Sequence, residues 1–182
     1  MRPLTDDETN LVFAKLEKFV GKEGVKNIID RKDEPYVLRL NKQRVFYISE
    51  SQLKQITSFS RDTLLSAGMC VGKFTHSGKF QITIHFLEVL AQFARHKVWL
   101  KPSAEMAFLY GSQVTKVGIA KITESIPQYA GVVVFNSAST ALPLGFGVAA
   151  QSTDVLPSLE PTAVVVLNYG DVGQWLRSES DL

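Results

Sequence analysis

Apolar residues recur with helical spacing near the N-terminus of this chain. Val12 and Leu16 begin a stripe at i and i+4, which a helix presents on a single face. The run Thr5-Asp6-Asp7-Glu8 precedes this stripe and has the form of a capping box, in which a hydroxyl and a carboxylate bond the free backbone amides of the first turn. We therefore predict a helix that begins at this box and ends at Gly21 and Gly24.

Four β-branched and aromatic runs in the first half of the chain occur as two pairs. Residues 36–40 and 44–48 are separated by a short polar segment. Residues 69–75 and 80–84 are separated by a segment that contains the turn dipeptide Ser77-Gly78. These spacings predict two antiparallel hairpins.

Helices are predicted after each of these hairpins. Ser49 is placed to cap a helix after the first one, and a short helical segment places Leu64 and Leu65 before the second one. A helix around Leu87 and Leu90 follows the second hairpin. The first half of the chain is therefore expected to form an antiparallel sheet with helices.

From Lys97 onward the pattern changes to short apolar runs that glycine and proline interrupt. These runs are continuous rather than alternating, as in strands that are buried on both faces or curl around a closed core. They occupy residues 98–100, 131–135, 145–149 and 163–167. Short strands with frequent turn signals predict a small barrel. The chain is thus expected to be an α+β protein with two domains, residues 1–95 and residues 96–182.

Charge is distributed unevenly between the two predicted domains, although the net charge of the chain is only +2. Residues 1–95 hold 15 Lys and Arg against 11 Asp and Glu, whereas residues 96–182 hold 5 against 7. Four of these five basic residues are concentrated in the first third of the second domain, namely Lys97, Lys101, Lys116 and Lys121. Any anion-binding face of that domain is expected to use this early segment.

The sequence contains no pattern of catalytic or metal-binding residues. Cys70 is the only cysteine, which excludes an internal disulfide, and the three histidines do not have the spacing of zinc ligands. Residues 145–150 match a dinucleotide-binding string, but Pro143 precedes them and Gln151-Ser152-Thr153 interrupts any following helix, so glycines in a curved strand are favoured. Residues 72–79 lack the glycine spacing of a phosphate-binding loop. We expect no enzymatic activity, cofactor or metal.

Membrane insertion and export are not expected either. The longest apolar stretches fall well short of the roughly 20 residues that cross a bilayer. The N-terminus runs directly into Asp6, Asp7 and Glu8, without the apolar segment of a secretory signal. An intracellular protein is expected.

Basic and aromatic residues are interleaved in two places. The second predicted hairpin carries Lys73, Phe74, Lys79 and Phe80. The second domain carries Trp99, Lys101, Phe108, Tyr110, Lys116 and Lys121. Lysines neutralise phosphates while exposed rings stack on unpaired bases, so this pattern is typical of proteins that bind single-stranded or looped RNA. The alternative is that the rings belong to the core and the lysines are only solvated, which is the more frequent case for rings in strands.

Three segments of the second domain resemble a known RNA-binding fold. Residues 108–119 resemble the signature of PUA domains, a glycine-bounded helix and loop that end in Gly-Ile. Residues 129–135 and 143–150 look like the paired central strands of that domain. The resemblance implies that the second domain is a PUA domain, a mixed β pseudo-barrel that binds RNA.

The chain as a whole resembles one family of proteins that contain this domain. The matching segments are Met1-Arg2-Pro3-Leu4-Thr5, Arg44-Val45-Phe46-Tyr47, Gly72-Lys73-Phe74-Thr75, Ser77-Gly78-Lys79-Phe80, Lys97-Val98-Trp99-Leu100-Lys101-Pro102, Leu109-Tyr110-Gly111 and Asp171-Val172-Gly173. They are similar to the eukaryotic ribosome-biogenesis family called nuclear import protein seven. The resemblance implies a non-enzymatic assembly factor of the nucleus and nucleolus, which acts on precursors of the large (60S) ribosomal subunit and supports precursor rRNA processing.

The resemblance also implies where RNA binds. The residues expected to contact RNA are Lys101, Tyr110, Lys116, Gly118, Lys121, Gln151 and Ser152. Gln151 stands where the family usually has lysine. Small residues around Gly118 let RNA approach the backbone, so Lys116 and Lys121 are expected to reach phosphates without burying their charge.

The partners implied by the resemblance are single-stranded or looped precursor rRNA and other large-subunit assembly factors. The protein itself is expected to be a monomer, with an N-terminal domain that mainly binds proteins. One alternative is a protein adaptor with incidental RNA contact, which the acidic balance of residues 96–182 supports. Another is an RNA-modifying enzyme, although the chain lacks a cofactor loop, paired carboxylates and a nucleophile site.

Overall fold

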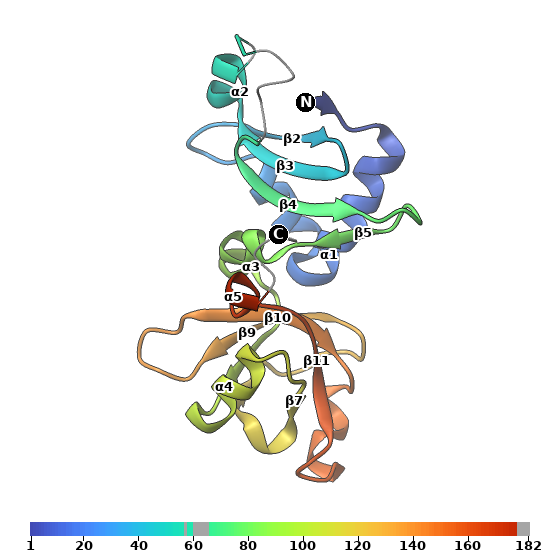
Figure 1. Ribbon diagram of the computed structural model, residues 1–182. Helices are drawn as coiled ribbons and strands as arrows, with labels where there is room; N and C mark the ends of the chain where they lie inside the picture. Colours follow the sequence, from blue (N-terminus) through green and yellow to red (C-terminus); the bar gives the residue numbers. More distant parts are fainter. Residues whose placement is uncertain (57, 60–65, 178–182) are drawn as a thin grey trace. The chain divides into compact units, whose positions relative to one another are not determined.

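The structure, a computed structural model, describes residues 1–56, 58–59 and 66–177 and divides into two units (Figure 1). Met1–Glu17 and Gly21–Phe86 form the first unit, and Lys18–Val20 and Leu87–Leu182 form the second. Helix α3 (Leu87–Phe93) belongs to the second unit. The domain boundary expected after residue 95 stays a prediction.

A five-stranded antiparallel sheet in the order β1-β2-β3-β4-β5 forms the frame of the first unit. Its strands are β1 (Arg2–Pro3), β2 (Tyr36–Asn41), β3 (Arg44–Ser49), β4 (Met69–Phe74) and β5 (Phe80–Ile82). Both predicted hairpins are confirmed, because Asn41 pairs with Arg44 in one and Phe74 pairs with Phe80 in the other. The pairing of β1 with β2 was not predicted, since two residues carry no periodic signal.

Helix α1 (Asp6–Ile29) begins at the predicted capping box. The Glu8 amide donates to Thr5 Oγ1 at 3.3 Å, and the Thr5 amide donates to Glu8 Oε2 at 2.9 Å. The Arg2 guanidinium, which also bonds Glu8, and then the Thr5 amide lower the pKa of the Glu8 carboxyl to about 2. The predicted start of the helix is therefore confirmed.

The predicted end of this helix is wrong. Gly21 leaves helical geometry at φ +73 and kinks the helix, but helical backbone resumes and continues to Ile29. The extension buries Val25 and Ile28, and their burial offsets the cost of about 1 kcal/mol that Gly24 imposes inside a helix.

Shorter helices follow the two hairpins. In α2 (Glu50–Ile56) the Gln52 amide donates to Ser49 Oγ at 3.3 Å, which confirms the predicted cap. The helical segment predicted at Leu64 and Leu65 lies outside the described residues. The helix predicted around Leu87 and Leu90 is confirmed as α3, and the 3-10 turn η1 (Ile84–Phe86) precedes it.

Tyr47 joins the sheet of the first unit to α1. Its hydroxyl donates to the backbone carbonyl of Ile28 at 2.5 Å, and its ring stacks on Tyr36 with centroids 4.3 Å apart. Burial raises the pKa of Tyr47, so the hydroxyl stays a donor. Because side chains alternate along a strand, Val45 and Ser49 share this α1 face with Tyr47, and Arg44 and Phe46 lie on the opposite face.

A six-stranded sheet in the order β7-β11-β10-β9-β6-β8 forms the second unit. Its strands are β6 (Lys97–Leu100), β7 (Val114–Thr115), β8 (Ile119–Ile122), β9 (Gly131–Asn136), β10 (Pro143–Ala149) and β11 (Val164–Asp171). Only the β6–β9 pair is parallel, which makes the sheet mixed. The four predicted strands are confirmed as β6, β9, β10 and β11. The short strands β7 and β8 were not predicted.

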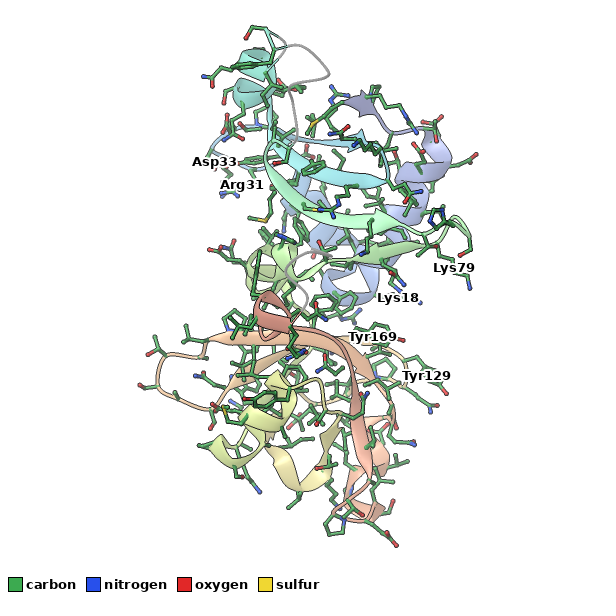
Figure 2. The ribbon with its side chains drawn as sticks, viewed as in Figure 1. Lys18, Arg31, Asp33, Lys79, Tyr129 and Tyr169 are labelled. Atoms are coloured by element: carbon green, nitrogen blue, oxygen red, sulfur yellow. The ribbon has the colours of Figure 1, made fainter. Side chains whose placement is uncertain are left out.

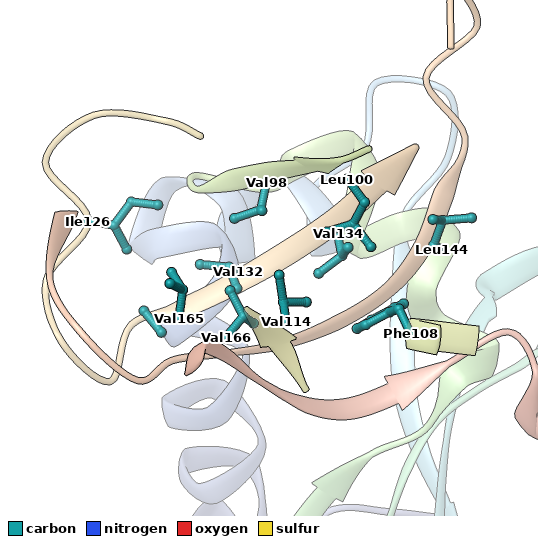
Figure 3. Close-up of a cluster of buried hydrophobic side chains, with 11 residues drawn as sticks. Val98, Leu100, Phe108, Val114, Ile126, Val132, Val134, Leu144, Val165 and Val166 are labelled. Carbon is teal, nitrogen blue, oxygen red and sulfur yellow. The ribbon is translucent and has the colours of Figure 1, made fainter. Parts of the chain in front are cut away.

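The sheet of the second unit curls around a core of aliphatic side chains and one phenylalanine (Figure 3). The core residues are Val98, Leu100, Phe108, Val114, Ile126, Val132, Val134, Leu144, Ala149, Val165 and Val166. They come from five strands, the helix α4 (Pro102–Leu109) and the loop before β9. This nearly closed mixed barrel, with the sheet and helices of the first unit, confirms the predicted α+β class.

Glycines in β10 allow the close strand approach that the barrel needs. A Cβ atom at Gly145 would lie 2.3 Å from the carbonyl oxygen of Gly170, and one at Gly147 would lie 2.1 Å from that of Leu167. The pairing with β11 also shifts register between Phe146 and Gly147. The interpretation of residues 145–150 as a curved strand rather than a dinucleotide loop is confirmed.

The helix predicted inside residues 108–119 lies earlier in the chain. Helix α4 occupies Pro102–Leu109, with Pro102 in its first turn, and the chain turns at Gly111 with φ +91. Residues 114–118 then form β7 and the 3-10 turn η2 (Lys116–Gly118). The prediction was wrong because the glycine pair at 111 and 118 bounds a strand and a turn rather than a helix.

We predict that Tyr47→Phe lowers the free energy of unfolding by about 1–2 kcal/mol, because it leaves the Ile28 carbonyl without its buried donor. Urea denaturation measures the effect. The control is Tyr110→Phe, which removes a hydroxyl from a side chain that is 72% exposed and should change stability little. Equal urea midpoints for both variants would show that the Tyr47 hydrogen bond contributes nothing to the free energy of unfolding.

Candidate nucleic-acid interface

Lys101 connects the end of β6 to the start of α4. The residue occupies the N-cap position of α4 and uses its backbone amide to bond the Gly118 carbonyl at 2.9 Å. Its Nζ donates to the Val117 carbonyl, also at 2.9 Å, while the side chain stays exposed. One lysine thus fixes η2 against the first turn of α4 and presents a positive charge to solvent beside it.

Gly118 brings η2 close to α4. A Cβ atom on this glycine would lie 2.8 Å from the Cβ atom of Ala104, so a larger residue would push the turn and the helix apart. Gly118 is buried by this contact. Gly118 thus allows close packing of η2 against α4, and approach of RNA to the same backbone stays a prediction.

Lys116 is held more firmly than a solvated lysine. Its Nζ donates to the carbonyl oxygens of Leu159 at 2.6 Å and Pro157 at 3.1 Å. Both acceptors lie at the end of the 3-10 turn η3 (Thr153–Ser158), where backbone carbonyls lack helical partners. The side chain is half-buried, which differs from the expected freely reaching lysine. Lys116 stabilises η3 as well as contributing charge.

Lys121 covers a pair of stacked rings on the outer side of the sheet. Trp99 pairs with Lys121 on β8 and with Phe135 on β9. The Lys121 ammonium lies 5.0 Å from the centroid of the Trp99 ring, which stacks on Phe135 at 5.9 Å. Lys97, on the same side of β6 as Trp99, lies 5.6 Å from the Phe135 centroid. Each cation–π contact contributes about 0.5–1 kcal/mol at a partly exposed site.

Tyr110 lies at the other end of α4 from Lys101. Its backbone caps the helix, and its side chain is 72% exposed. Met106, one turn earlier on the same helix face, is 58% exposed. At 1.5 Å per residue, α4 separates Tyr110 from Lys101 by roughly 13 Å. An exposed aromatic ring thus lies at one end of α4 and an exposed ammonium at the other.

A buried carboxylate fixes the Tyr110 end of α4. Asp171 is only 1% exposed and bonds Arg177 Nη2 with both oxygens at 2.9 Å. Arg177 also donates to the Leu109 carbonyl, and Asn168 Nδ2 bonds both Asp171 at 3.2 Å and the Phe108 carbonyl at 3.1 Å. The last carbonyls of α4 thus receive donors from residues far along the sequence. No local sequence signal could have indicated this network.

Gln151 and Ser152 lie at the opposite end of β9 from Lys101. Strand β6 runs parallel to β9 and reaches Asn136, whereas β10 returns antiparallel toward Gly131 before Gln151. Both residues are half-buried and precede η3, where the Ile126 amide bonds Thr153 Oγ1 at 2.9 Å. Their part in RNA binding stays a prediction.

The structure therefore separates the predicted site residues into a cluster and two outlying positions. Lys116 and Gly118 lie in η2, Lys101 bonds its backbone, and Lys121 follows it on β8. We call these four residues the η2 cluster. Tyr110 lies at the other end of α4, and Gln151 and Ser152 lie directly before η3, at the opposite end of β9 from Lys101. Lys97, which was not among the predicted site residues, lies over the Phe135 ring beside Trp99 and Lys121.

Titratable groups other than lysine supply no metal site within the described part of the chain. Among those residues, no three His, Cys, Asp or Glu side chains gather to hold an ion. Burial, followed by the nearby Arg95 charge, lowers the pKa of His96, so this buried side chain is neutral near pH 7. Within the described residues, no helix has the length and apolar character that crossing a membrane requires.

Comparison with protein families assigns both units of the chain. The family model described as NIP7/UPF0113, pre-PUA domain, matches residues 1–84. The model described as UPF0113 PUA domain matches residues 96–180. Together they account for the sheet and helices of the first unit and the barrel of the second.

Solved structures share this fold at low sequence identity. A PUA domain from Aeropyrum pernix K1 covers 96% of this chain and 87% of its own length, with a TM-score of 0.60 and 15% identity. A conserved PUA domain protein from Thermoplasma acidophilum covers 96% of this chain and 95% of its own, with a TM-score of 0.57 and 15% identity. These similarities support the fold alone.

Curated relatives match the whole chain. The "60S ribosome subunit biogenesis protein NIP7 homolog" of Xenopus tropicalis is 50% identical over 100% of this chain and 99% of its own length. The "60S ribosome subunit biogenesis protein nip7" of Schizosaccharomyces pombe is 48% identical over the same shares. With both domain models and full-length relatives in agreement, the chain belongs to the NIP7/UPF0113 family of pre-PUA and PUA domain proteins.

Proposed function

We propose that this protein is a non-enzymatic, RNA-binding assembly factor in the biogenesis of the large (60S) ribosomal subunit. The observation that carries the proposal is the 50% identity over 100% of the chain to a relative named as a 60S ribosome subunit biogenesis protein. The factor supports processing of precursor rRNA and works in the nucleus and nucleolus. It acts as a monomer, and its N-terminal domain mainly engages other assembly factors.

The η2 cluster is the proposed RNA contact of the second unit. Lys101 and Lys121 are exposed, and each is already held by the fold, Lys101 through the Val117 carbonyl of η2 and Lys121 over the Trp99 ring. Cations that are positioned before a phosphate arrives require little side-chain ordering on binding. RNA phosphates would take over from the Val117 carbonyl as acceptor for Lys101.

Single-stranded or looped precursor rRNA fits the exposed Tyr110 ring at the end of α4 best. The Tyr110 ring is accessible for stacking, and unpaired bases are the nucleic-acid groups that stack on aromatic side chains. In contrast, Trp99 is covered by Lys121 on one side and Phe135 on the other, so it serves as a support for the lysine rather than as a base platform.

A protein adaptor with incidental RNA contact is the second candidate. Met106, Tyr110 and Val117 are all more than half exposed, and exposed apolar and aromatic side chains are typical anchors of protein interfaces. Lysine substitutions distinguish the two candidates. They should weaken RNA binding, which depends on cations, and should have little effect on an apolar protein interface, which depends on these three side chains.

We predict that Lys101→Glu with Lys121→Glu raises the Kd for single-stranded RNA about tenfold, a change of about 1.4 kcal/mol, because two phosphate contacts become repulsive. Fluorescence anisotropy measures the affinity. Lys22→Glu with Lys26→Glu on the exposed side of α1 is the matched control, since it changes the net charge equally. Similar losses in both variants would mean that only overall charge matters.

We predict that Lys116→Ala costs about 1 kcal/mol of stability, because the carbonyls of Pro157 and Leu159 lose their donor. Thermal unfolding monitors the change. Lys101→Ala is the matched control, since its single carbonyl bond is exposed and should cost less than about 0.5 kcal/mol. If Lys116→Ala unfolds at the wild-type temperature, Lys116 is a solvated lysine and becomes a proper probe of RNA binding.

We predict that depletion of the protein in its own cells lowers free large subunits and leaves small subunits at their normal level. Sucrose-gradient profiles and precursor rRNA blots measure both pools. Re-expression of the wild-type chain should restore the large subunit, whereas the Lys101→Glu, Lys121→Glu variant should restore it only partly. An equal loss of both subunits contradicts the proposed function.

A further inference from the structure

The sheet of the first unit is free of acidic residues over two long stretches. Residues 36–49 form the β2–β3 hairpin, and residues 69–84 form the β4–β5 hairpin and the following turn. Neither stretch contains Asp or Glu. Together they carry five basic residues, namely Arg39, Lys42, Arg44, Lys73 and Lys79. These two stretches therefore carry only positive formal charge, whereas the acidic first turn of α1 follows β1 and its Glu8 is paired with Arg2.

The turns of both hairpins lie at the same end of the sheet. The Phe74 amide donates to the Gln43 carbonyl at 2.8 Å, which brings the end of β4 beside the β2–β3 turn. Lys42 is exposed at that turn with φ +55, and Lys79 is exposed at the tip of the β4–β5 hairpin (Figure 2). Two ammonium groups therefore project from neighbouring turns.

Strand register places further cations next to these turns. Arg44 lies on the face opposite α1, and Lys73 on β4 is its direct partner. On β2, Asn41 is the partner of Arg44. Arg39 lies two residues before Asn41, so its side chain is on the same face of the sheet as that of Arg44. We name these five residues, Arg39, Lys42, Arg44, Lys73 and Lys79, the turn-end surface.

The aromatic rings of the second hairpin lie away from this surface. Phe74 and Phe80 alternate with Lys73 and Gln81, so they point toward the α1 face, and their rings contact each other at 5.2 Å. Phe80 is buried. The turn-end surface therefore offers cations without stacking platforms, which suits contact with a phosphate backbone rather than with bases.

The surface also lacks the apolar anchors that a protein partner uses. None of the large hydrophobic side chains that are exposed in the described residues lies within 36–49 or 69–84. Protein interfaces bury an apolar and aromatic centre, whereas nucleic-acid contacts consist largely of cations that face phosphates. Charge complementarity and the missing anchors both favour RNA over an acidic protein segment.

We propose that the turn-end surface of the first unit is a second RNA-binding surface, which holds phosphates of the RNA backbone without reading its sequence. The proposal rests on the proposed function only in taking the protein to be an RNA binder. It assigns an RNA contact to the domain that was expected mainly to bind proteins. Binding at this surface is independent of the η2 cluster, which supplies other phosphate contacts.

The test is Lys42→Glu with Lys79→Glu in the full chain, because both side chains are exposed at turns. The probes are a labelled mixed-sequence single-stranded RNA and a duplex RNA. The Kd for single-stranded RNA should rise about tenfold, and the log–log salt slope should become shallower by about 1.4, since each phosphate contact on a single strand contributes about 0.7. The duplex should lose affinity as well, because backbone contacts do not need unpaired bases.

Lys22→Glu with Lys26→Glu is the control and should leave the salt slope unchanged. If the turn-end variant binds RNA as the control does, the inference is overturned, whatever the Lys101→Glu, Lys121→Glu variant does. If RNA affinity falls in the turn-end variant but not in the Lys101→Glu, Lys121→Glu variant, the inference is supported and the η2 cluster is refuted as an RNA contact. Loss of binding to polyglutamate with unchanged RNA affinity would assign the surface to an acidic protein and overturn the inference. Should the Glu variant fail to fold, Lys42→Gln with Lys79→Gln must show the same change of slope.

Discussion

The parallel pairing of β6 with β9 is the contact on which the second unit depends. Every other strand pair in the barrel is antiparallel, and β8 joins the sheet only through β6. Val98 and Leu100 on β6 pack with Val132 and Val134 on β9 in the same core, and all four are fully buried. Burial of these side chains, at about 1.5–3 kcal/mol each, holds residues 97–122 against the remaining strands.

The position of the η2 cluster follows from this pairing. Because β6 ends at Leu100 beside Asn136, the next residue, Lys101, enters α4 at the barrel rim, and Gly118 allows η2 to return to the same place. Lys101, Lys116 and Lys121 are each engaged with the protein, two through backbone carbonyls and one through an aromatic ring. Each of these lysines is thus held in place by the fold itself.

Local signals in the sequence predicted the elements whose causes are local. The capping box at Thr5, the cap at Ser49 and the hairpin turn at Gly78 depend on residues a few positions apart, and each appears as predicted. The curved strand at Gly145 and Gly147 was also predicted, since glycine in an apolar run signals close approach. The overall class, α+β with a barrel, followed from the change of periodicity near Lys97.

Features that depend on distant contacts could not be predicted in this way. Gly111 ends a helix that precedes it, because Pro102 begins α4 far earlier than the resemblance suggested. The carbonyl partners of Lys116 are more than 40 residues away, at separations of 41 and 43. No pattern within a local window distinguishes such an anchored lysine from a solvated one, which is why the site residues were predicted as one group and lie in three places.

Arg177 gives the second unit a distinct order of assembly. Its bond to the Leu109 carbonyl spans 68 residues, and its carboxylate partner Asp171 lies in the last strand of the sheet. Contacts of such long sequence separation form late, since chain entropy must be lost before they contribute. During synthesis α4 emerges long before Arg177, so its C-terminal end stays uncapped while β9, β10 and β11 are still being made. The C-terminal end of α4 is therefore completed only once Arg177 has been made, and a shorter nascent chain lacks the Arg177 donor to the Leu109 carbonyl.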